Sequence, residues 1–469
     1  MPDGRFYEAI RSLPEDVVME SKLSWSSIFR LGLVQAALGA IVVLTTSALN
    51  RIMVVELALP AIIPGALVTL HHAMQMLRPR MGHGSDVGQR RTPWIVGGMA
   101  TLAVGGTGAA VATAVAANHF ALGMVLAVVS FALIGCGVSA AGTSLLVLMA
   151  KRVAEERRAA AATIVWMMMI AGFAITATVA GKLLDPFSPS RLIAVAGEVS
   201  GGALLLALAA IWGVEGRARE PVVAVADDGA KPSFKESFKQ VWSEPDARRF
   251  TVFVFVSMLA YSAQDLILEP FAGAVFAFTP GASTKLSGAQ HGGVFAGMLL
   301  VAVMTSAFKG TRLASLKGWV VGGCIASGVA MLGLVLAGLR GGHWPLKENV
   351  FLLGVTNGVF AIAAIGSMMT LASRGKGKKE GMRMGLWGAA QSIAFGAGGF
   401  AGTVLVDLAK RVFGPSGAAY SFVFGLEAVG FFVAYWLAMT TPFSEAATST
   451  ESSPDLTPPV PAMRARKAG

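Results

Sequence analysis

Polar side chains interrupt a long apolar stretch near the start of the chain. Asn50 and Arg51 stand at its end, and Glu56 follows shortly after. An amide, a guanidinium and a carboxylate are costly in lipid, so in membrane segments they usually face the protein interior or a water-filled cavity and pair with one another. The chemistry that these residue types support is charge pairing and the binding of a proton or a cation.

A second polar cluster lies in a later apolar stretch, where Gln264 and Asp265 precede Glu269 and Pro270. Asp265 and Glu269 are four residues apart and therefore lie on one face of a helix. Two carboxyl groups so placed share a proton or a cation, or are neutralised by a base. Pro270 cannot donate to the helical ladder, so it frees a backbone carbonyl one turn earlier. The alternative is that both carboxylates border the outer headgroup region.

The expected heights of these groups in the membrane favour a pair between them. Arg51 comes about 23 residues after Ile28. Glu269 comes about 19 after Phe250, so at ~1.5 Å per residue the two lie within about 6 Å in height. A buried arginine stays charged and needs an acceptor. We predict that Arg51 pairs with Asp265 or Glu269 and closes the outer side, while Glu56 is expected beyond the helix end.

A further carboxyl group is expected inside the membrane at Glu427. It lies about 11 residues into a helix that is expected to begin near Ser416. That places it about 16 Å deep, close to the middle of the bilayer. We predict that Glu427 is protonated or contacts a polar group of a neighbouring helix.

The composition is that of an all-α polytopic membrane protein. The 469 residues are 54% hydrophobic and 14% charged, whereas a soluble domain carries about 25% charged residues. Twelve apolar segments have the ~20 residues that are needed to cross ~30 Å of hydrocarbon. We place them at 27–50, 58–77, 93–116, 119–148, 161–183, 191–213, 250–277, 291–310, 317–339, 349–372, 383–407 and 416–440.

Basic residues indicate the orientation. With the N-terminus in the cytoplasm, 30 of the 38 Lys and Arg residues fall on the inner side, which is the bias typical of membrane proteins. We therefore expect an inner-membrane protein with both termini cytoplasmic. The net charge of +11 then reflects topology and does not indicate binding of nucleic acid. The first 26 residues lack the apolar region of a cleavable signal peptide, so the first helix is expected to direct insertion.

The sequence contains an internal repeat. A Trp, a Gly and an Asp recur at matching positions, which are Trp166, Gly181 and Asp185 in the first copy and Trp387, Gly402 and Asp407 in the second. The sixth and twelfth segments each carry Glu-x-x-Gly, at Glu198 and Glu427. Repeats of this kind are typical of transporter folds and predict two six-helix halves.

The predicted organisation is a polar N-terminal tail at 1–26, a first half at 27–213, a linker at 214–249, a second half at 250–440 and a disordered tail at 441–469. Within the linker, Ser233 and Glu236 form a capping-box pattern that precedes apolar residues on one helical face. This pattern predicts a short helix at the inner membrane interface. A solvated linker helix is the alternative.

Twelve helices in two halves with a long central loop resemble the major facilitator superfamily. Its members carry, between the second and third segments, a Gly, an Asp four residues later and a basic cluster. Gly82, Asp86, Arg90 and Arg91 match this motif. Val87 replaces the usual basic residue, and the second glycine comes one position early. Because of these departures, the gating role of the loop is not carried over.

Three stretches give a more specific resemblance. They are LNRIMVVEL at 49–57, AQDLILEPFAGAVF at 263–276 and the glycine-rich GMRMGLWGAAQSIAFGAGGFAGT at 381–403. They resemble the PucC/LhaA-type bacteriochlorophyll delivery family, and the resemblance covers about residues 25–440. It implies a photosynthetic membrane accessory protein that helps assemble light-harvesting complexes by delivering or inserting bacteriochlorophyll. The implied partners are light-harvesting antenna polypeptides, the pigment or its synthesis machinery, and membrane lipid.

Histidines are the first residues to consider as pigment ligands, because the magnesium of bacteriochlorophyll accepts one axial nitrogen or oxygen ligand. His71 and His72, in the second segment, are our candidates. The alternative is that both bond to neighbouring side chains. His291 is expected in a loop at a helix end. Cys136 and Cys324 both fall in apolar segments, which supports neither a disulfide nor a metal site.

Two other functions compete with pigment delivery. One is a proton-coupled exporter of a small apolar molecule that uses Asp265, Glu269 and Glu427. The other is an enzyme of pigment synthesis. The sequence contains no P-loop, nucleophile elbow or Cys/His metal spacing, which argues against the enzyme.

Overall fold

The computed structural model describes residues 23–78, 90–216, 239, 242–308, 311–374, 380–414 and 416–441. Within these residues the chain forms twelve α-helices and no strand. Six precede the central linker: α3 (Trp25–Leu44), α4 (Ile62–Met74), α6 (Thr92–Ala116), α7 (Phe120–Arg152), α8 (Glu155–Leu183) and α9 (Pro189–Ile211). Six follow it: α11 (Pro245–Phe276), α12 (Pro280–Ala307), α13 (Leu316–Arg340), α14 (Leu346–Arg374), α15 (Glu380–Phe413) and α16 (Gly417–Thr440).

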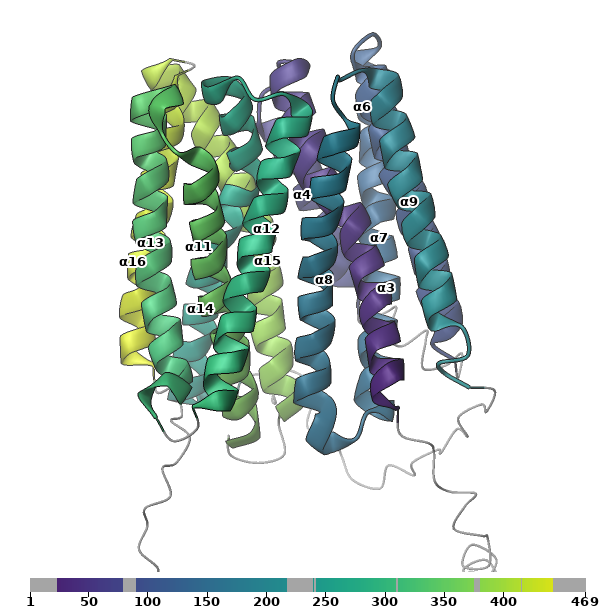
Figure 1. Cartoon of the computed structure of the whole chain (residues 1–469), viewed down its shortest axis with the longest axis vertical. Helices are drawn as coiled ribbons and strands as arrows, with labels where there is room; N and C mark the ends of the chain where they lie inside the picture. The colour runs from purple at the N-terminus through teal and green to yellow at the C-terminus, as the bar shows by residue number, and fades with distance from the viewer. Residues whose placement is uncertain are drawn as a thin grey trace, which may run out of the picture.

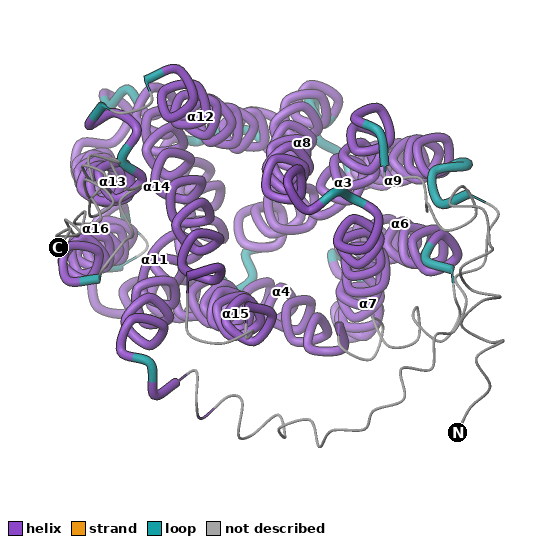
Figure 2. Tube along the Cα trace, turned by 90° about the horizontal axis from the view of Figure 1, so that it is seen from below, coloured by secondary structure: helices purple, strands orange, loops and turns teal. Residues whose placement is uncertain are grey.

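The helices run up and down side by side and form two groups (Figures 1 and 2). Contacts between the groups are made mainly by α8 with α12 and by α4 with α15. Each group has its own hydrophobic core, one built almost entirely from α3–α9 and the other from α11–α16. Large apolar side chains such as Val104, Ile175 and Leu205 are exposed on the outside, as a lipid-facing surface requires.

The prediction of twelve membrane helices is confirmed, although one helix is short. Eleven described helices are long and apolar enough to cross a membrane. The second segment, expected at 58–77, is helical only over Ile62–Leu77, where α4 is followed by a short 3₁₀ turn. Sixteen residues span about 24 Å, less than the ~30 Å hydrocarbon core. Pro60 precedes the helix and Pro64 falls in its first turn, where a missing N–H is tolerated.

Several helix boundaries differ from those expected, and three of them are described here. The first segment does not end at residue 50, because two π-helical stretches, Thr45–Leu49 and Ile52–Glu56, continue α3. The seventh begins at Pro245 instead of 250. The eighth begins at Pro280 instead of 291, since the Thr279 side chain accepts a 3.1 Å bond from the Ala282 N–H and caps the helix.

Several of the expected features lie outside the described residues. They are the tails up to residue 22 and from 442 onwards, and the linker residues Ser233 and Glu236.

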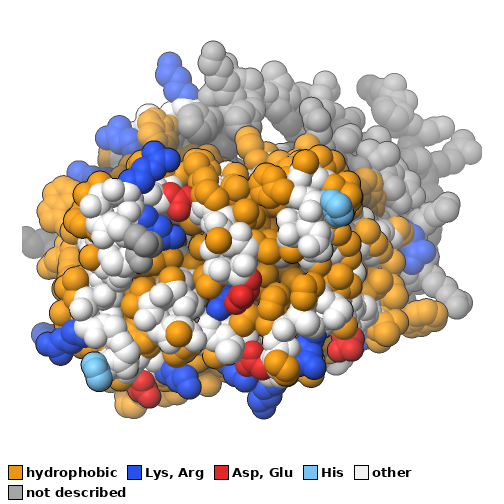
Figure 3. All heavy atoms as spheres, turned by 90° about the horizontal axis from the view of Figure 1, so that it is seen from above, with side chains coloured by type: hydrophobic (Ala, Val, Ile, Leu, Met, Phe, Trp, Pro, Cys, Tyr) orange, Lys and Arg blue, Asp and Glu red, His pale blue; other side chains and the backbone are white. Residues whose placement is uncertain are grey.

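We use the term far side for one end of the bundle. It is the end opposite to that at which α3 begins and α16 ends. Figure 3 shows the bundle from above, with acidic and basic side chains scattered among apolar and uncharged ones.

Candidate functional site

The polar residues of the first segment lie in two π-helical stretches, Thr45–Leu49 and Ile52–Glu56, and in the two residues between them. Thr45 Oγ1 donates back to the Val42 carbonyl over 2.7 Å, and Thr46 reaches the same carbonyl. Hydroxyl groups that bond the backbone in this way compete with the α-helical ladder, which favours local widening of the helix. Insertions of this kind occur often at functional sites. They direct Ser47, Asn50 and Arg51 into the boundary between the two helix groups.

Asn50 contacts the second group through a carbonyl that Pro270 frees. Pro270 has no N–H to donate, so the Leu266 carbonyl, four residues earlier, lacks its helical partner. Asn50 Nδ2 donates to this oxygen over 2.6 Å. The carbonyl freed by Pro270, as expected from the sequence, therefore joins α11 to the first segment.

Glu269 is buried and its carboxyl group is held by hydroxyls. Ser47 Oγ donates to Glu269 Oε1, and Thr284 Oγ1 of α12 lies 3.4 Å from Oε2. The side chain is 2% exposed. A buried carboxyl group needs such donors because an unsatisfied one is strongly destabilising. Glu269 thus joins three elements at the far side of the bundle.

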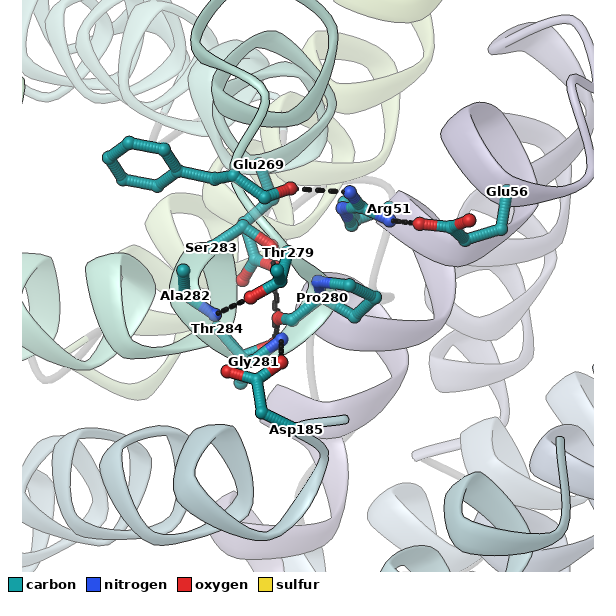
Figure 4. A network of polar contacts seen from close by, with 11 residues as sticks. Arg51, Glu56, Asp185, Glu269, Thr279, Pro280, Gly281, Ala282, Ser283 and Thr284 are labelled. Atoms are coloured by element: carbon teal, nitrogen blue, oxygen red, sulfur yellow. Dashed lines mark hydrogen bonds and ion pairs between the residues drawn. The ribbon is translucent and has the colours of Figure 1, made fainter. Parts of the chain in front are cut away.

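Arg51 bridges the two groups, but its ionic partner is not the predicted one. Its guanidinium pairs with Glu56 of its own segment (Figure 4). It also donates over 2.6 Å to the backbone carbonyl of Phe278. The prediction of a pair with Asp265 or Glu269 is wrong. The reason is the second π-helical stretch, in which residues five apart stack on one another and Glu56 is brought back to Arg51.

A small cavity lies at the centre of the bundle, between the two groups. Its volume is about 130 Å³, and its polar lining includes His72, Asp265, Gln290 and His291. The expectation that His291 lies in a loop is wrong, because α12 begins eleven residues earlier than expected and carries His291 inward. Its ring meets Phe173 edge to face, and Nδ1 is 2.9 Å from the Ser287 carbonyl oxygen.

His71 and His72 share one polar neighbour. The Gln75 amide nitrogen lies 3.1 Å from His71 Nε2 and 3.3 Å from His72 Nδ1. His71 is buried, and His72 lines the central cavity near Phe395. Among the described residues, no three His, Cys, Asp or Glu side chains are grouped to hold a metal ion.

Two predicted polar residues are buried without satisfied side chains. Both carboxylate oxygens of Glu427 and both amide atoms of Gln264 lack a hydrogen-bond partner among the residues described. Glu427 is 5% exposed and close enough to Asp265 for their charges to interact. Buried polar groups in this state are usually satisfied by water or by a ligand. Gln264, Asp265 and Glu427 therefore mark the polar interior of the second group.

The repeated aspartates have equivalent positions at the far side. Asp407 accepts bonds from the N–H groups of Ala61 (3.1 Å) and Ile62 (2.8 Å), at the start of α4. Asp185 accepts from the Gly281 N–H (3.1 Å) at the start of α12 and lies 3.8 Å from Lys285. Each aspartate thus caps a helix of the other group. We call these two contacts the aspartate clasps; Figure 4 shows the one at Asp185.

The inner-loop motif is only partly visible. Gly82 and Asp86 lie outside the described residues. Arg90 is exposed, whereas Arg91 is buried and its backbone N–H donates to Glu215 over 2.5 Å. Thr92 N–H donates to the same carboxylate over 2.7 Å. Glu215, at the end of the first helix group, therefore caps α6, a contact that the motif did not predict.

Removing an aspartate clasp is expected to destabilise the protein modestly. Asp407→Ala leaves two N–H groups of α4 without their acceptor, and losing an N-cap costs about 0.5–2 kcal/mol. Asp185→Ala should cost a similar amount, and the pair should be additive because the sites share no partner. Asp246→Ala is the matched control, since Asp246 lies in the first turn of α11 but is exposed. Thermal unfolding in detergent measures the difference; an equal loss for the control would contradict it.

Comparison with known proteins places the chain in a family. A family model described as PUCC protein matches residues 48–446. The chain belongs to the PUCC family. It is 50% identical over 419 residues to the bacteriochlorophyll synthase 44.5 kDa chain of Rhodobacter capsulatus, covering 89% of this chain and 95% of that one. It is 29% identical to protein PucC of the same species, covering 91% and 94%.

Solved structures show the fold of this PUCC-family protein to be that of a major facilitator transporter. A peptide transporter, POT, in complex with sulfate superposes with a TM-score of 0.64 at 14% identity, covering 92% of this chain and 98% of the transporter. A bacterial homologue of the human lysosomal transporter Spinster, in an inward-facing and occupied conformation, gives 0.63 at 13% identity, covering 88% and 96%. At these identities the likeness concerns the fold alone.

Proposed function

We propose that this chain is an accessory protein of the photosynthetic membrane that helps assemble light-harvesting complexes by delivering or inserting bacteriochlorophyll. The observation that carries the proposal is membership of the PUCC family, together with a relative of 50% identity named as a bacteriochlorophyll synthase chain. The proposed partners are antenna polypeptides and the pigment or the machinery that makes it. In the proposed orientation both termini are cytoplasmic and the far side faces outward.

We propose further that the chain handles the pigment and does not synthesise it. The name of the R. capsulatus relative leaves an enzymatic role open. Support for a non-enzymatic role comes from the transporter fold and from the use of the interior polar residues. Asn50, Arg51 and Glu269 are engaged in contacts that join the two helix groups, and these contacts give them a structural task.

Deleting the gene is expected to lower antenna content while pigment-synthesis chemistry continues. The reason is that a delivery factor acts after the pigment has been made. The measurement is membrane absorption of the antenna bands, together with chromatography of pigment precursors, in the organism that encodes the protein. The control is the deletion strain carrying the gene on a plasmid. Normal antenna content would contradict the proposal, and a build-up of one biosynthetic intermediate would indicate an enzyme.

A proton-coupled exporter remains the second candidate. It is favoured by one observation: Asp265 lines the central cavity, and Glu427 is buried nearby with both carboxylate oxygens unsatisfied among the described residues. Buried carboxyl groups inside membrane proteins often belong to proton pathways. Proton uptake into proteoliposomes that is coupled to the movement of a small apolar molecule would favour this function over pigment delivery.

A further inference from the structure

A lateral groove runs along the outside of the first helix group. Its floor is α3 and its walls are α8 and α9, which pack against α3 but scarcely touch each other. Figure 1 shows α3 between these two helices. The groove has a volume of about 420 Å³ and is lined almost entirely by apolar and small residues, among them Ala36, Ala40, Gly172, Ile175 and Gly202.

One charged residue, Glu198, lines the lateral groove. It lies nine residues beyond the first residue of α9, Pro189, or about 13 Å along the helix, and so deep in the hydrocarbon region. The side chain is exposed, and no described residue bonds to it. An ionised carboxylate in contact with lipid at this depth is strongly unfavourable unless a group from outside the chain pairs with it. A ligand that matches the groove is therefore mostly apolar and offers one group to a carboxylate.

The lateral groove and the central cavity differ in what they can hold. Sites for small organic ligands have volumes of about 300–1,000 Å³, and the lateral groove falls in this range at about 420 Å³. The central cavity, at about 130 Å³, has room for only about four waters at ~30 Å³ each. A tetrapyrrole therefore does not fit beside His72 in this conformation, whereas the lateral groove is about three times larger and is open along the side of the helix bundle.

We propose that the lateral groove is the binding site of a magnesium tetrapyrrole, with the Glu198 carboxylate as the axial ligand of the magnesium. This inference rests on the proposed function and adds to it the site and the ligand. Magnesium is a hard cation that prefers oxygen ligands, and a carboxylate is among the best of them. The flat, apolar macrocycle matches the apolar walls, and the small residues of the floor allow a close approach to the helix backbone. Pigment could then enter and leave sideways, without passing through the bundle.

The test is direct binding of pigment to the purified full-length protein in lipid nanodiscs. Bacteriochlorophyll a and the same pigment without magnesium are titrated separately and followed by absorption and by quenching of protein fluorescence. We expect Glu198→Leu to weaken binding of the magnesium pigment by about tenfold or more, since even indirect losses at metal sites cost 10–100-fold. Binding of the magnesium-free pigment should be weak and should not change. Glu198→His supplies another axial ligand and should restore binding.

A second variant tests the groove itself. A Cβ at Gly202 would meet nothing within 4 Å, so Gly202→Leu should fill the groove without disturbing the fold. The matched control is Gly97→Leu. A Cβ at Gly97 also meets nothing within 4 Å, and Gly97 lines a different groove, of about 370 Å³, between α6 and α7. No carboxylate lines that groove. We expect Gly202→Leu to weaken pigment binding and Gly97→Leu to leave it unchanged.

The possible outcomes separate this inference from the proposed function. If the wild type binds the magnesium pigment and all four variants bind it equally well, the groove is not the site, but pigment delivery stands. If the wild type binds no pigment, both proposals fail. If Glu198→Leu and Gly202→Leu keep the pigment but lose a co-purifying antenna polypeptide, the occupant is a transmembrane helix, and the inference is overturned.

Discussion

Glu56→Leu is expected to destabilise the protein by up to about 3–5 kcal/mol, because it leaves the buried Arg51 charge without its ionic partner. The Arg51 side chain is 3% exposed, and it cannot escape the loss by releasing its proton. Its remaining acceptor, the Phe278 carbonyl, carries no full charge. Arg51→Leu should cost less, because the Glu56 side chain it leaves behind is 35% exposed and can be hydrated.

The pair can be examined by comparing four variants in one assay. The double variant Arg51→Leu/Glu56→Leu should be close to Arg51→Leu alone and more stable than Glu56→Leu, since it leaves no buried charge. Glu56→Gln keeps an acceptor oxygen without the charge and should fall between the wild type and Glu56→Leu. Equilibrium unfolding in mixed detergent micelles gives the free energies. Strictly additive losses would show that the two side chains do not act as a pair.

Gly354→Leu is expected to prevent folding of the second helix group. A Cβ at Gly354 would collide with the Gln290 carbonyl oxygen on α12, and Gly358 meets the Val294 carbonyl in the same way. Gly297 of α12 in turn faces the Val355 carbonyl of α14. At each of these positions the backbone of one helix contacts the backbone of the other. No flexible side chain can move aside there, so the two helices would have to separate to admit a larger residue. Gly354→Ala, the milder change, should cost about 1–3 kcal/mol.

The yield of monodisperse protein after detergent extraction measures this effect. Gly322→Leu is the matched control, because a Cβ at Gly322, in α13, meets nothing within 4 Å. The control should be recovered like the wild type, whereas Gly354→Leu should aggregate. Normal recovery and an unchanged melting temperature for Gly354→Leu would mean that α12 and α14 do not depend on this close approach.

The sequence was most informative where one physical rule dominated. Lipid-facing helices must be apolar over their length, so hydropathy located the twelve segments. Proline cannot donate a backbone bond, so Pro270 indicated a free carbonyl, which Asn50 uses. The repeated Asp185 and Asp407 were visible as a pattern, but the capping contacts they make depend on which helices the fold brings together.

Most of the errors come from polar residues that contact other parts of the protein and do not face lipid. The first turns of α12 contain Ser283, Thr284 and Lys285 and therefore do not look like a membrane helix. They are tolerated because Thr284 contacts Glu269 and because Lys285 lies beside Asp185. The same error placed His291 in a loop. The Arg51–Glu56 pair was missed because it depends on π-helical geometry, which a 1.5 Å rise per residue does not describe.

The short α4 helix has a consequence for the surrounding bilayer. With its 3₁₀ extension it covers about 24 Å, and it packs against α7 and α15 while exposing Ile62 and Met76. Lipid beside this helix must compress by about 6 Å to cover its apolar surface, at a fraction of a kcal/mol per Å. This thinning is confined to one side of the bundle, because each of the other eleven described candidate spans has at least 23 residues and is long enough to cross the full hydrocarbon core. The protein therefore imposes an uneven thickness on the lipid around it.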